Sequence, residues 1–372
     1  MSHPKFQELA APGVRGLVPY QPGKPIEELE REYGVSHAIK LASNENPLGP
    51  SPLALVAAHE ALASLARYPD GGGFALRDEL AKRLGVERDA ITLGNGSNDV
   101  LELVARAFVT PEDEVVFSQY AFAVYPLVTQ AIGAQAVVTP ARDFGHDLAA
   151  MAASVTPRTR LVFIANPNNP TGTWLTSSAL EDFVGKMPAH VIVVIDEAYF
   201  EYVAEPHYPN TLSWLSRYPN LVVARTFSKA YGLAGLRVGF AVSHPALANL
   251  LNRVRQPFNV NSIALAAAVA ALGDEDHLAK ARALNQEGMA ILTRGVTVLG
   301  LDYIPSVGNF VAVDVGRVAT PLYEALLYQG VIVRPLGNYG MPNHLRVTIG
   351  LPEENARFLS ALARVLHMGA AP

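Results

Sequence analysis

Short β-rich runs alternate with helical stretches between residues 90 and 242, and this alternation limits the chain to few folds. Most of the runs are apolar at nearly every position, which is typical of strands buried on both faces. They cover residues 90–93, 114–117, 135–139, 160–164, 190–195, 221–224 and 238–242. Because segments with helical periodicity lie between them, we predict an α/β fold with a mostly parallel sheet covered by helices on both sides.

The connection before the last of these runs differs from the others. Residues 225–237 carry several polar groups and leave no room for a covering helix. Without a crossover helix, a strand is more easily joined antiparallel to its predecessor. We therefore predict that residues 238–242 form an antiparallel strand, either at an edge or as an insertion in the sheet.

The two ends of the chain have a different organisation. With 372 residues the chain has the length of about two domains. Residues 1–45 are punctuated by proline and glycine and predict an arm that packs on the rest, and residues 46–275 are assigned to the large domain. Residues 276–372 predict an interdomain helix and a small α+β domain. Its predicted strands and helices are residues 309–315, 331–334 and 344–349, and 321–328 and 353–367.

Composition excludes several classes of function. Lys and Arg number 29 against 34 Asp and Glu, so no polycationic face for nucleic acid or anionic lipid is expected. The absence of cysteine excludes disulfides and a thiol nucleophile, and it suits a reducing compartment. The first residues lack an apolar signal core, and the apolar run 262–273 is shorter than the about 20 residues that span a membrane. We expect a cytoplasmic protein.

One lysine, Lys229, stands between a hydroxyl and a glycine-rich turn, directly after a buried strand. Its segment also contains Ser228 and Arg237. Sheets of this class present ligand groups at strand ends. Burial beside other cations lowers the pKa of a lysine amine and frees it to form an imine. Lys229 is therefore a candidate nucleophile with Arg237 as its neighbouring cation, and the alternative is a solvated loop lysine.

A carboxylate and a phenol follow another apolar strand. Asp196 comes directly after residues 191–195, and Tyr199 follows three residues later. Such a carboxylate needs a partner, which can be a metal ion, a helix amino terminus or a protonated ring nitrogen. Because the 10 histidines are scattered with no i, i+4 pair, we do not expect a metal site.

Two further strand ends lead into loops with polar groups. Residues 165–172, ANPNNPTG, include Asn169 and are also compatible with a plain turn. Residues 94–99, GNGSND, lead into a helix, and backbone N–H groups at such a helix start suit a phosphate. A simple helix cap by Ser97 or Asn98 is the alternative.

Three aromatic residues, Tyr120, Phe122 and Tyr125, follow one more strand. At least one of these rings is expected to pack in the core. Another could stack on a flat ligand, which needs one aromatic face. Together, the strand ends offer an anion cradle, an aromatic face, an amide loop, an acid with a phenol, and a lysine with an arginine. This set suits a flat, phosphorylated, basic heteroaromatic ring that is also bound covalently, and pyridoxal phosphate is such a ring.

With these motifs the chain resembles the fold-type I pyridoxal-phosphate-dependent aminotransferases, and among them the histidinol-phosphate aminotransferase family. The resemblance extends over nearly the whole chain. It rests on NENP at residues 44–47, RYP at 67–69, GSND at 96–99, NPNNPTG at 166–172, DEAY at 196–199, TFSKAYGLAGLR at 226–237 and LRVTIG at 345–350. It implies the fold-type I architecture and a homodimer with shared active sites.

The resemblance also implies a role for each matching residue around the cofactor. Lys229 is expected to form the imine and then to move a proton between the substrate and the cofactor. Asp196 is expected to pair with the ring nitrogen, while Tyr199 and Asn169 bind the ring oxygen. The remaining cofactor contacts are expected from Ser97, Asn98, Asp99, Ser228 and Arg237 at the phosphate, from Phe122 or Tyr120 at the ring face, and from Tyr68 of the other subunit.

For the substrate, the resemblance implies that Arg346 binds the α-carboxylate of amino acids. Arg334 and Tyr20 match the groups with which the family binds the substrate phosphate. The implied reaction transfers the amino group of L-histidinol phosphate to 2-oxoglutarate in histidine biosynthesis. The alternatives are an aromatic amino acid aminotransferase, a phosphothreonine decarboxylase-like lyase, and a non-catalytic module that retains the cofactor.

Overall fold

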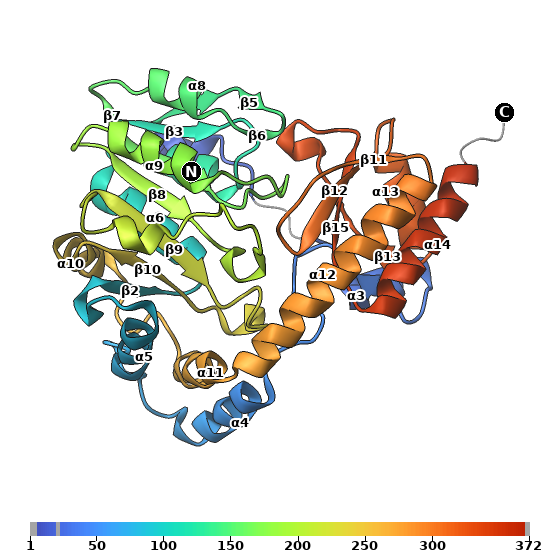
Figure 1. Cartoon of the computed structure of the whole chain (residues 1–372), viewed down its shortest axis with the longest axis horizontal. Coiled ribbons are helices and arrows are strands. Elements are labelled where there is room, and N and C mark those ends of the chain that lie inside the picture. Colours follow the sequence, from blue (N-terminus) through green and yellow to red (C-terminus); the bar gives the residue numbers. More distant parts are fainter. Residues whose placement is uncertain (1–5, 20–22, 369–372) are drawn as a thin grey trace, which may run out of the picture.

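The computed structural model describes residues 6–19 and 23–368, which form a larger and a smaller lobe (Figure 1). The larger lobe contains a seven-stranded sheet and the smaller lobe a four-stranded sheet. A 24-residue helix, α12 (Glu275–Val298), runs from one lobe to the other (Figure 1). The site described below lies where the two lobes meet.

The seven-stranded sheet has the order β2-β10-β9-β8-β7-β3-β4. Its strands are β2 (Ile91–Gly94), β3 (Glu114–Ser118), β4 (Gln135–Thr139), β7 (Thr159–Ala165), β8 (Ile192–Asp196), β9 (Leu221–Thr226) and β10 (Gly239–Ser243). The pairs from β4 through β9 are parallel, and β10 is antiparallel to both β9 and β2. The predicted antiparallel strand is therefore confirmed, and it is an insertion between two strands.

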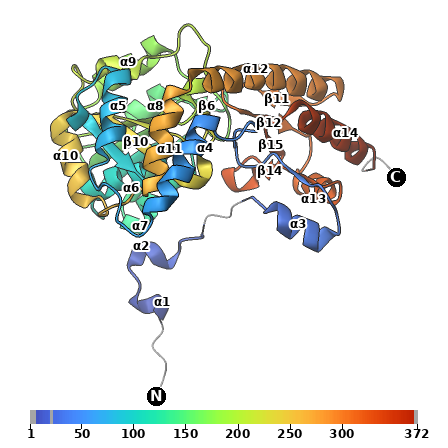
Figure 2. The same cartoon turned by 90° about the horizontal axis from the view of Figure 1, so that it is seen from below.

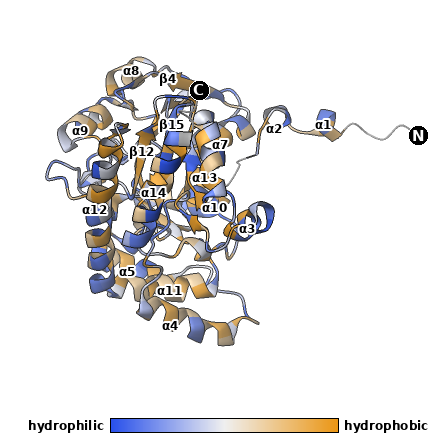
Figure 3. Ribbon diagram, turned by 90° about the vertical axis from the view of Figure 1, so that its right-hand side faces the viewer, coloured by the Kyte–Doolittle hydropathy of each residue, from blue (hydrophilic) through white to orange (hydrophobic). Residues whose placement is uncertain are grey.

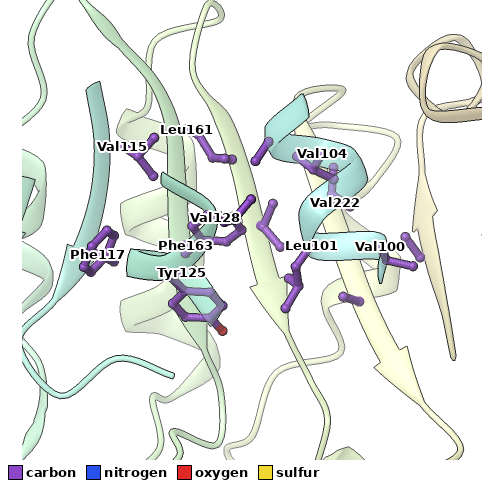
Figure 4. Packing of buried hydrophobic residues seen from close by; sticks show 14 of the residues in the cluster. Val100, Leu101, Val104, Val115, Phe117, Tyr125, Val128, Leu161, Phe163 and Val222 are labelled. Atoms are coloured by element: carbon purple, nitrogen blue, oxygen red, sulfur yellow. The ribbon is translucent and has the colours of Figure 1, made fainter. Parts of the chain in front are cut away.

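Both faces of this sheet are buried, as the continuous apolar runs predicted, except at the edge strand β4, where Val138 is 54% exposed. One face packs against α6 (Ser97–Phe108), α7 (Val124–Ile132) and α10 (Pro245–Val254), and part of this cluster is shown in Figure 4. The opposite face packs against α8 (Leu148–Ala153) and α9 (Ser177–Lys186), and toward β2 against α4 (Pro52–Ala61), α5 (Phe74–Leu84) and α11 (Ser262–Gly273). Neighbouring residues of one strand point to opposite faces: Val222 joins the first cluster and Val223 the second.

The smaller lobe is an antiparallel sheet of order β11-β12-β15-β14, packed against α13 (Thr320–Tyr328) and α14 (Pro352–Met368). Its strands are β11 (Asp302–Ile304), β12 (Phe310–Asp314), β14 (Arg334–Pro335) and β15 (His344–Thr348). The structure divides the predicted strand 331–334 into β13 (Val331–Ile332) and β14, because β13 pairs with β1 (Ile39–Lys40) instead. The short strand β11 was not predicted.

The remaining elements are short. Near the start of the chain, α2 (Pro12–Arg15) packs against α7, whereas α3 (Ile26–Tyr33) packs against α13 of the smaller lobe (Figure 2). The others are α1 (Phe6–Leu9), the hairpin β5 (Ala141–Arg142) and β6 (Gly145–His146), and the 3-10 turns Leu62–Ser64, Arg88–Ala90, Phe200–Tyr202, Thr211–Trp214, Ala234–Leu236 and Gly337–Tyr339. Within the described ranges, none of the helices combines the length and apolarity that crossing a membrane requires.

Candidate active site

A cavity of about 320 Å³ lies at the carboxyl ends of the central strands. This is the edge at which parallel sheets bind ligands. Ser43 and Asn44 from the first part of the chain and Arg346 of β15 complete its wall. The structure brings most of the predicted site residues together here, namely Ser97, Asn98, Phe122, Asn169, Asp196, Tyr199, Ser228, Lys229, Arg237 and Arg346.

Lys229 lies three residues beyond the end of β9, and its Nζ donates a hydrogen bond to the Ser43 carbonyl oxygen at 3.0 Å. Burial, together with the positive charges of Arg346 and Arg237, lowers the pKa of Lys229 to about 7, against the opposing effect of Glu45. Loss of hydration and nearby positive charge both disfavour the ammonium form. Sequence reasoning identified Arg237 as the neighbouring cation but not the larger effect of Arg346.

Asp196 is the last residue of β8 and is 4% exposed. Its Oδ2 accepts a hydrogen bond from the Tyr125 hydroxyl at 3.0 Å, and its Oδ1 accepts one from the Ala198 backbone N–H at 3.2 Å. Burial raises the pKa of Asp196 to about 6, although both hydrogen bonds act in the opposite direction. The carboxylate is therefore buried at the cavity wall with capacity left for a cationic partner.

Tyr199 has its ring beneath the lysine, with Lys229 Nζ 5.7 Å from the ring centroid. Its hydroxyl accepts a hydrogen bond from Asn44 Nδ2 at 2.9 Å. Burial raises the pKa of Tyr199 to about 12, so the phenol is protonated at neutral pH. Sequence reasoning assigned no role to Asn44, although the motif at residues 44–47 was recognised.

The amino terminus of α6 faces Arg237 across a tight backbone crossing. Arg237 adopts a left-handed conformation with φ 56°, and its Nη1 donates to Ser228 Oγ at 3.2 Å. A Cβ atom at Gly96 would lie 2.3 Å from Arg237 Nη2, and one at Gly239 would lie 2.5 Å from the Ser97 nitrogen. Only glycine therefore allows this guanidinium to approach the helix start, where N–H groups and the helix dipole favour an anion.

Asp99 turns its side chain away from this cavity. Its Oδ2 accepts hydrogen bonds from the Asn95 backbone N–H at 2.8 Å and from Asn259 Nδ2 at 2.7 Å. The carboxylate thus ties the loop before α6 to the segment after α10. The role predicted for Asp99 is to offer its backbone N–H to a phosphate. The side-chain contacts do not test this role, so it stays a prediction.

Arg346 and Asn169 meet on the side of the smaller lobe. Arg346 Nη1 donates to Asn169 Oδ1 at 2.5 Å, and Nη2 donates to the Ala42 carbonyl oxygen at 2.7 Å. The side chain also lies against the Phe310 ring, with 5.4 Å from Cζ to the ring centroid. These contacts orient a guanidinium that is only 5% exposed toward the cavity.

The two candidate aromatic faces are separated by the structure. Phe122 lines the cavity, whereas the Tyr120 ring stacks on Phe144 at 5.8 Å and packs with residues of the smaller lobe. Of these two candidates, Phe122 is therefore the one available to a ligand in this cavity.

Besides Asp99, the predicted residues Tyr68 and Arg334 do not line this cavity in one chain. Tyr68 is 83% exposed and stacks on Phe258 at 4.8 Å. Arg334 lines a neighbouring cavity, and Leu127 lines both. Tyr20 lies outside the described residues. In the ranges that are described, no group of three His, Cys, Asp or Glu side chains is arranged to hold a metal ion.

Comparison with known proteins identifies the class to which this fold and site belong. Residues 36–362 match the family model for aminotransferase class I and II. A histidinol-phosphate aminotransferase from Nitrosococcus oceani is 62% identical over 367 residues, which is 99% of each chain. One from Pseudomonas fluorescens is 63% identical over 363 residues, 97% of this chain and 98% of the relative.

A solved structure agrees with these relatives. The histidinol-phosphate aminotransferase from Sinorhizobium meliloti, in complex with pyridoxal-5'-phosphate, superposes with a TM-score of 0.90 at 31% identity over 96% of this chain and 98% of that chain. The chain therefore belongs to the class I and II aminotransferases and, within them, to the histidinol-phosphate aminotransferase family. The predicted family and fold class are confirmed.

Proposed function

We propose that this protein transfers the amino group of L-histidinol phosphate to 2-oxoglutarate, giving 3-(imidazol-4-yl)-2-oxopropyl phosphate and L-glutamate. The reaction belongs to histidine biosynthesis. The observation that carries the proposal is one cavity in which Lys229, with its pKa lowered to about 7, shares the wall with Asp196 and Arg237. This set provides a nucleophilic amine, an anion and a cation for one ligand.

The cavity has the donors and acceptors that pyridoxal phosphate requires. Asp196 offers a buried carboxylate to a ring N–H, and Arg237, with Ser228 and the start of α6, offers donors to a phosphate. Asn169 and Tyr199 line the same cavity and are assigned to the ring oxygen, and Phe122, which also lines it, is assigned to the ring face. When bound, this cofactor supplies an electron sink for the carbon that loses its proton.

Lys229 is suited to move that proton. With a pKa of about 7, its amine is largely uncharged above neutral pH and can accept a proton at Nζ. The Ser43 carbonyl oxygen, 3.0 Å away, accepts a hydrogen bond from Nζ and holds the amine at the cavity wall. Arg346 disfavours the ammonium form, so it helps return the proton to the substrate side.

The anionic end of the substrate requires fixed cations, which β14 and β15 provide. Arg346 points into the cavity, and Arg334 lies in the adjoining cavity with Tyr323 and Tyr339. A guanidinium can bind phosphate or carboxylate through paired hydrogen bonds. We assign Arg346 to the carboxylate of glutamate, and Arg334 with Tyr20 to the phosphate of histidinol phosphate.

We also propose that the active protein is a homodimer in which Tyr68 contributes to the partner's site. Tyr68 is 83% exposed, and the nearby helix α4 presents Leu53, Leu55 and Val56, each more than half exposed at 53%, 55% and 58%. Figure 3 displays α4 at the edge of the molecule. Exposed apolar side chains clustered on one helix are typical of a subunit interface.

The proposed domain division is an arm over residues 1–45, a large cofactor-binding domain over 46–275, and an interdomain helix with a small domain over 276–372. The pairing of β1 with β13 supports an arm that packs on the small domain.

The chain has no cysteine, in keeping with a proposed location in the reducing cytoplasm.

Steady-state kinetics with two amino donors tests the proposed reaction. Glutamate formation from 2-oxoglutarate is measured with L-histidinol phosphate and, separately, with L-phenylalanine. We expect kcat/KM for L-histidinol phosphate to be the higher by at least about tenfold, the effect of one charge-assisted contact. A higher value for phenylalanine would identify an aromatic amino acid aminotransferase, and carbon dioxide release would identify a lyase.

A further inference from the structure

Tyr125 is the one member of the aromatic cluster after β3 whose hydroxyl reaches the buried acid of the site. Its side chain is 0% exposed, and its hydroxyl donates to Asp196 Oδ2 at 3.0 Å. Figure 4 shows its ring in the core cluster with the hydroxyl oxygen pointing away from Val115 and Leu161. A hydroxyl buried among apolar side chains is costly unless it has a partner, and Asp196 is that partner.

The Tyr125 ring is fixed from two sides. It stacks on Phe163 of β7 with centroids 4.5 Å apart and an interplanar angle of 4°. Its other contact is an edge-to-face arrangement with Phe122 at 5.9 Å and 85°. One side chain therefore contacts both the aromatic face of the cavity and the acid on its wall, and Phe163 holds it in place.

The charges around Asp196 make this hydrogen bond important. Glu197 raises the pKa of Asp196, whereas Lys229 lowers it. Burial, with a smaller effect of the Asp196 charge, raises the pKa of Tyr199 and of Tyr208, so both phenols stay protonated near the carboxylate. Arg225 forms an ion pair at 2.8 Å with Glu197, the residue after Asp196, so its positive charge is paired with Glu197. The hydroxyl of Tyr125 and the N–H of Ala198 therefore carry much of the stabilisation of the anion.

We propose that Tyr125 is a positioning residue that holds Asp196 as an oriented anion for a protonated ring nitrogen and fixes Phe122 against the same ring. The proposal rests on the proposed cofactor of this site. It assigns a role in the reaction to a buried residue of α7 that bonds to Asp196 and packs against Phe122. It follows that Tyr125 should increase the preference of the protein for a cofactor with a ring nitrogen over one with a carbon at that position.

The test measures equilibrium binding to the apoprotein of pyridoxal phosphate and of its 1-deaza analogue, in which a C–H replaces the ring nitrogen. The ratio of the two Kd values is determined for the wild type, Tyr125→Phe, Asp196→Asn and Tyr202→Phe. Tyr202→Phe removes the hydroxyl of another buried tyrosine, which is 8% exposed, and serves as the matched control. Tyr125→Phe keeps the ring and its contacts with Phe163 and Phe122.

We expect Tyr125→Phe to lower the preference for pyridoxal phosphate about tenfold, the effect of one hydrogen bond to a charged group, while binding of the deaza analogue stays unchanged. Tyr202→Phe should leave the ratio unchanged. A Tyr125→Phe protein that binds both ligands equally more weakly, or that keeps the full preference while Asp196→Asn loses it, would show a packing role and overturn the inference. If Asp196→Asn also keeps the preference, the assigned role of Asp196 fails, and the inference fails with it.

Discussion

Arg334 and Arg346 stand directly opposite each other as cross-strand partners on β14 and β15. Paired residues of an antiparallel ladder have their side chains on the same face, with Cβ atoms about 5 Å apart. Two like charges in such a pair are unfavourable unless an anion lies between or beside them. The proposed function uses this pair as an anion receptor, with Arg334 assigned to the phosphate of histidinol phosphate and Arg346 to the carboxylate of glutamate.

Replacement of Arg334 tests this receptor. We expect Arg334→Ala to raise KM for L-histidinol phosphate about tenfold to a hundredfold, because a hydrogen-bonded charge opposite a phosphate is lost. KM for glutamate should change far less, because its carboxylate is assigned to Arg346. Steady-state kinetics with both donors measures this, and Arg364→Ala on α14 is the matched control. Equal losses for the two donors would refute the phosphate role.

The lowered pKa of Lys229 predicts a pH dependence of cofactor capture. The amine must be uncharged to attack an aldehyde, so the rate at which apoprotein captures pyridoxal phosphate should rise as pH increases through about 7. Arg346→Gln removes a cation that disfavours the ammonium form, and the midpoint should move to higher pH. Stopped-flow absorbance across pH 5.5 to 9 in about half-unit steps gives both profiles. An unchanged midpoint in Arg346→Gln would contradict the assigned electrostatic effect.

The buried carboxylate of Asp196 should lower the free energy of unfolding of the apoprotein above about pH 6. Its folded pKa of about 6 lies above the unfolded value, so its contribution is most favourable below pH 3.8 and becomes less favourable as pH rises through 6. At pH 8, Asp196→Asn should therefore raise the free energy of unfolding of the apoprotein by about 2 to 3 kcal/mol. Urea denaturation measures this, with the exposed Asp302→Asn on β11 as control. If Asp196→Asn instead destabilises the apoprotein at pH 8, burial does not disfavour the ionised carboxylate.

The proposed homodimer with shared sites predicts recovery of activity in mixed dimers. Lys229→Ala and Tyr68→Ala homodimers should each be nearly inactive. After the two proteins are unfolded and refolded together, hybrid dimers contain one site with neither change, so about a quarter of wild-type activity should return. No recovery, although hybrids are detected by native mass spectrometry, would exclude a contribution of Tyr68 to the partner's site.

The sequence predicts the larger sheet well because its signals are local. Strands buried on both faces are continuous apolar runs, and polar residues directly after them gather at one edge of a parallel sheet. Lys229, Asp196 and Asn169 therefore meet in one cavity as expected. Even the antiparallel direction of β10 follows from the short connection before it.

Other features depend on contacts between distant segments. Asn44 bonds Tyr199 across 155 positions, and no local pattern indicates that pairing. The pairing of β1 with β13 involves two residues on each strand, too few to give a periodic signal. The hydroxyl of Tyr125 looks like that of any core tyrosine until the side chain of Asp196 is seen beside it. Charge, burial and hydrogen bonding at such points are set by the folded structure.

The most direct measurement of the central claim is the site of covalent attachment of the cofactor. The holoenzyme is reduced with borohydride, digested and mapped by mass spectrometry. We predict that the added mass of the reduced cofactor lies on the peptide that contains Lys229, and that Lys229→Ala carries none. Attachment to another lysine, or a holoenzyme with Lys229 unmodified, would contradict the account.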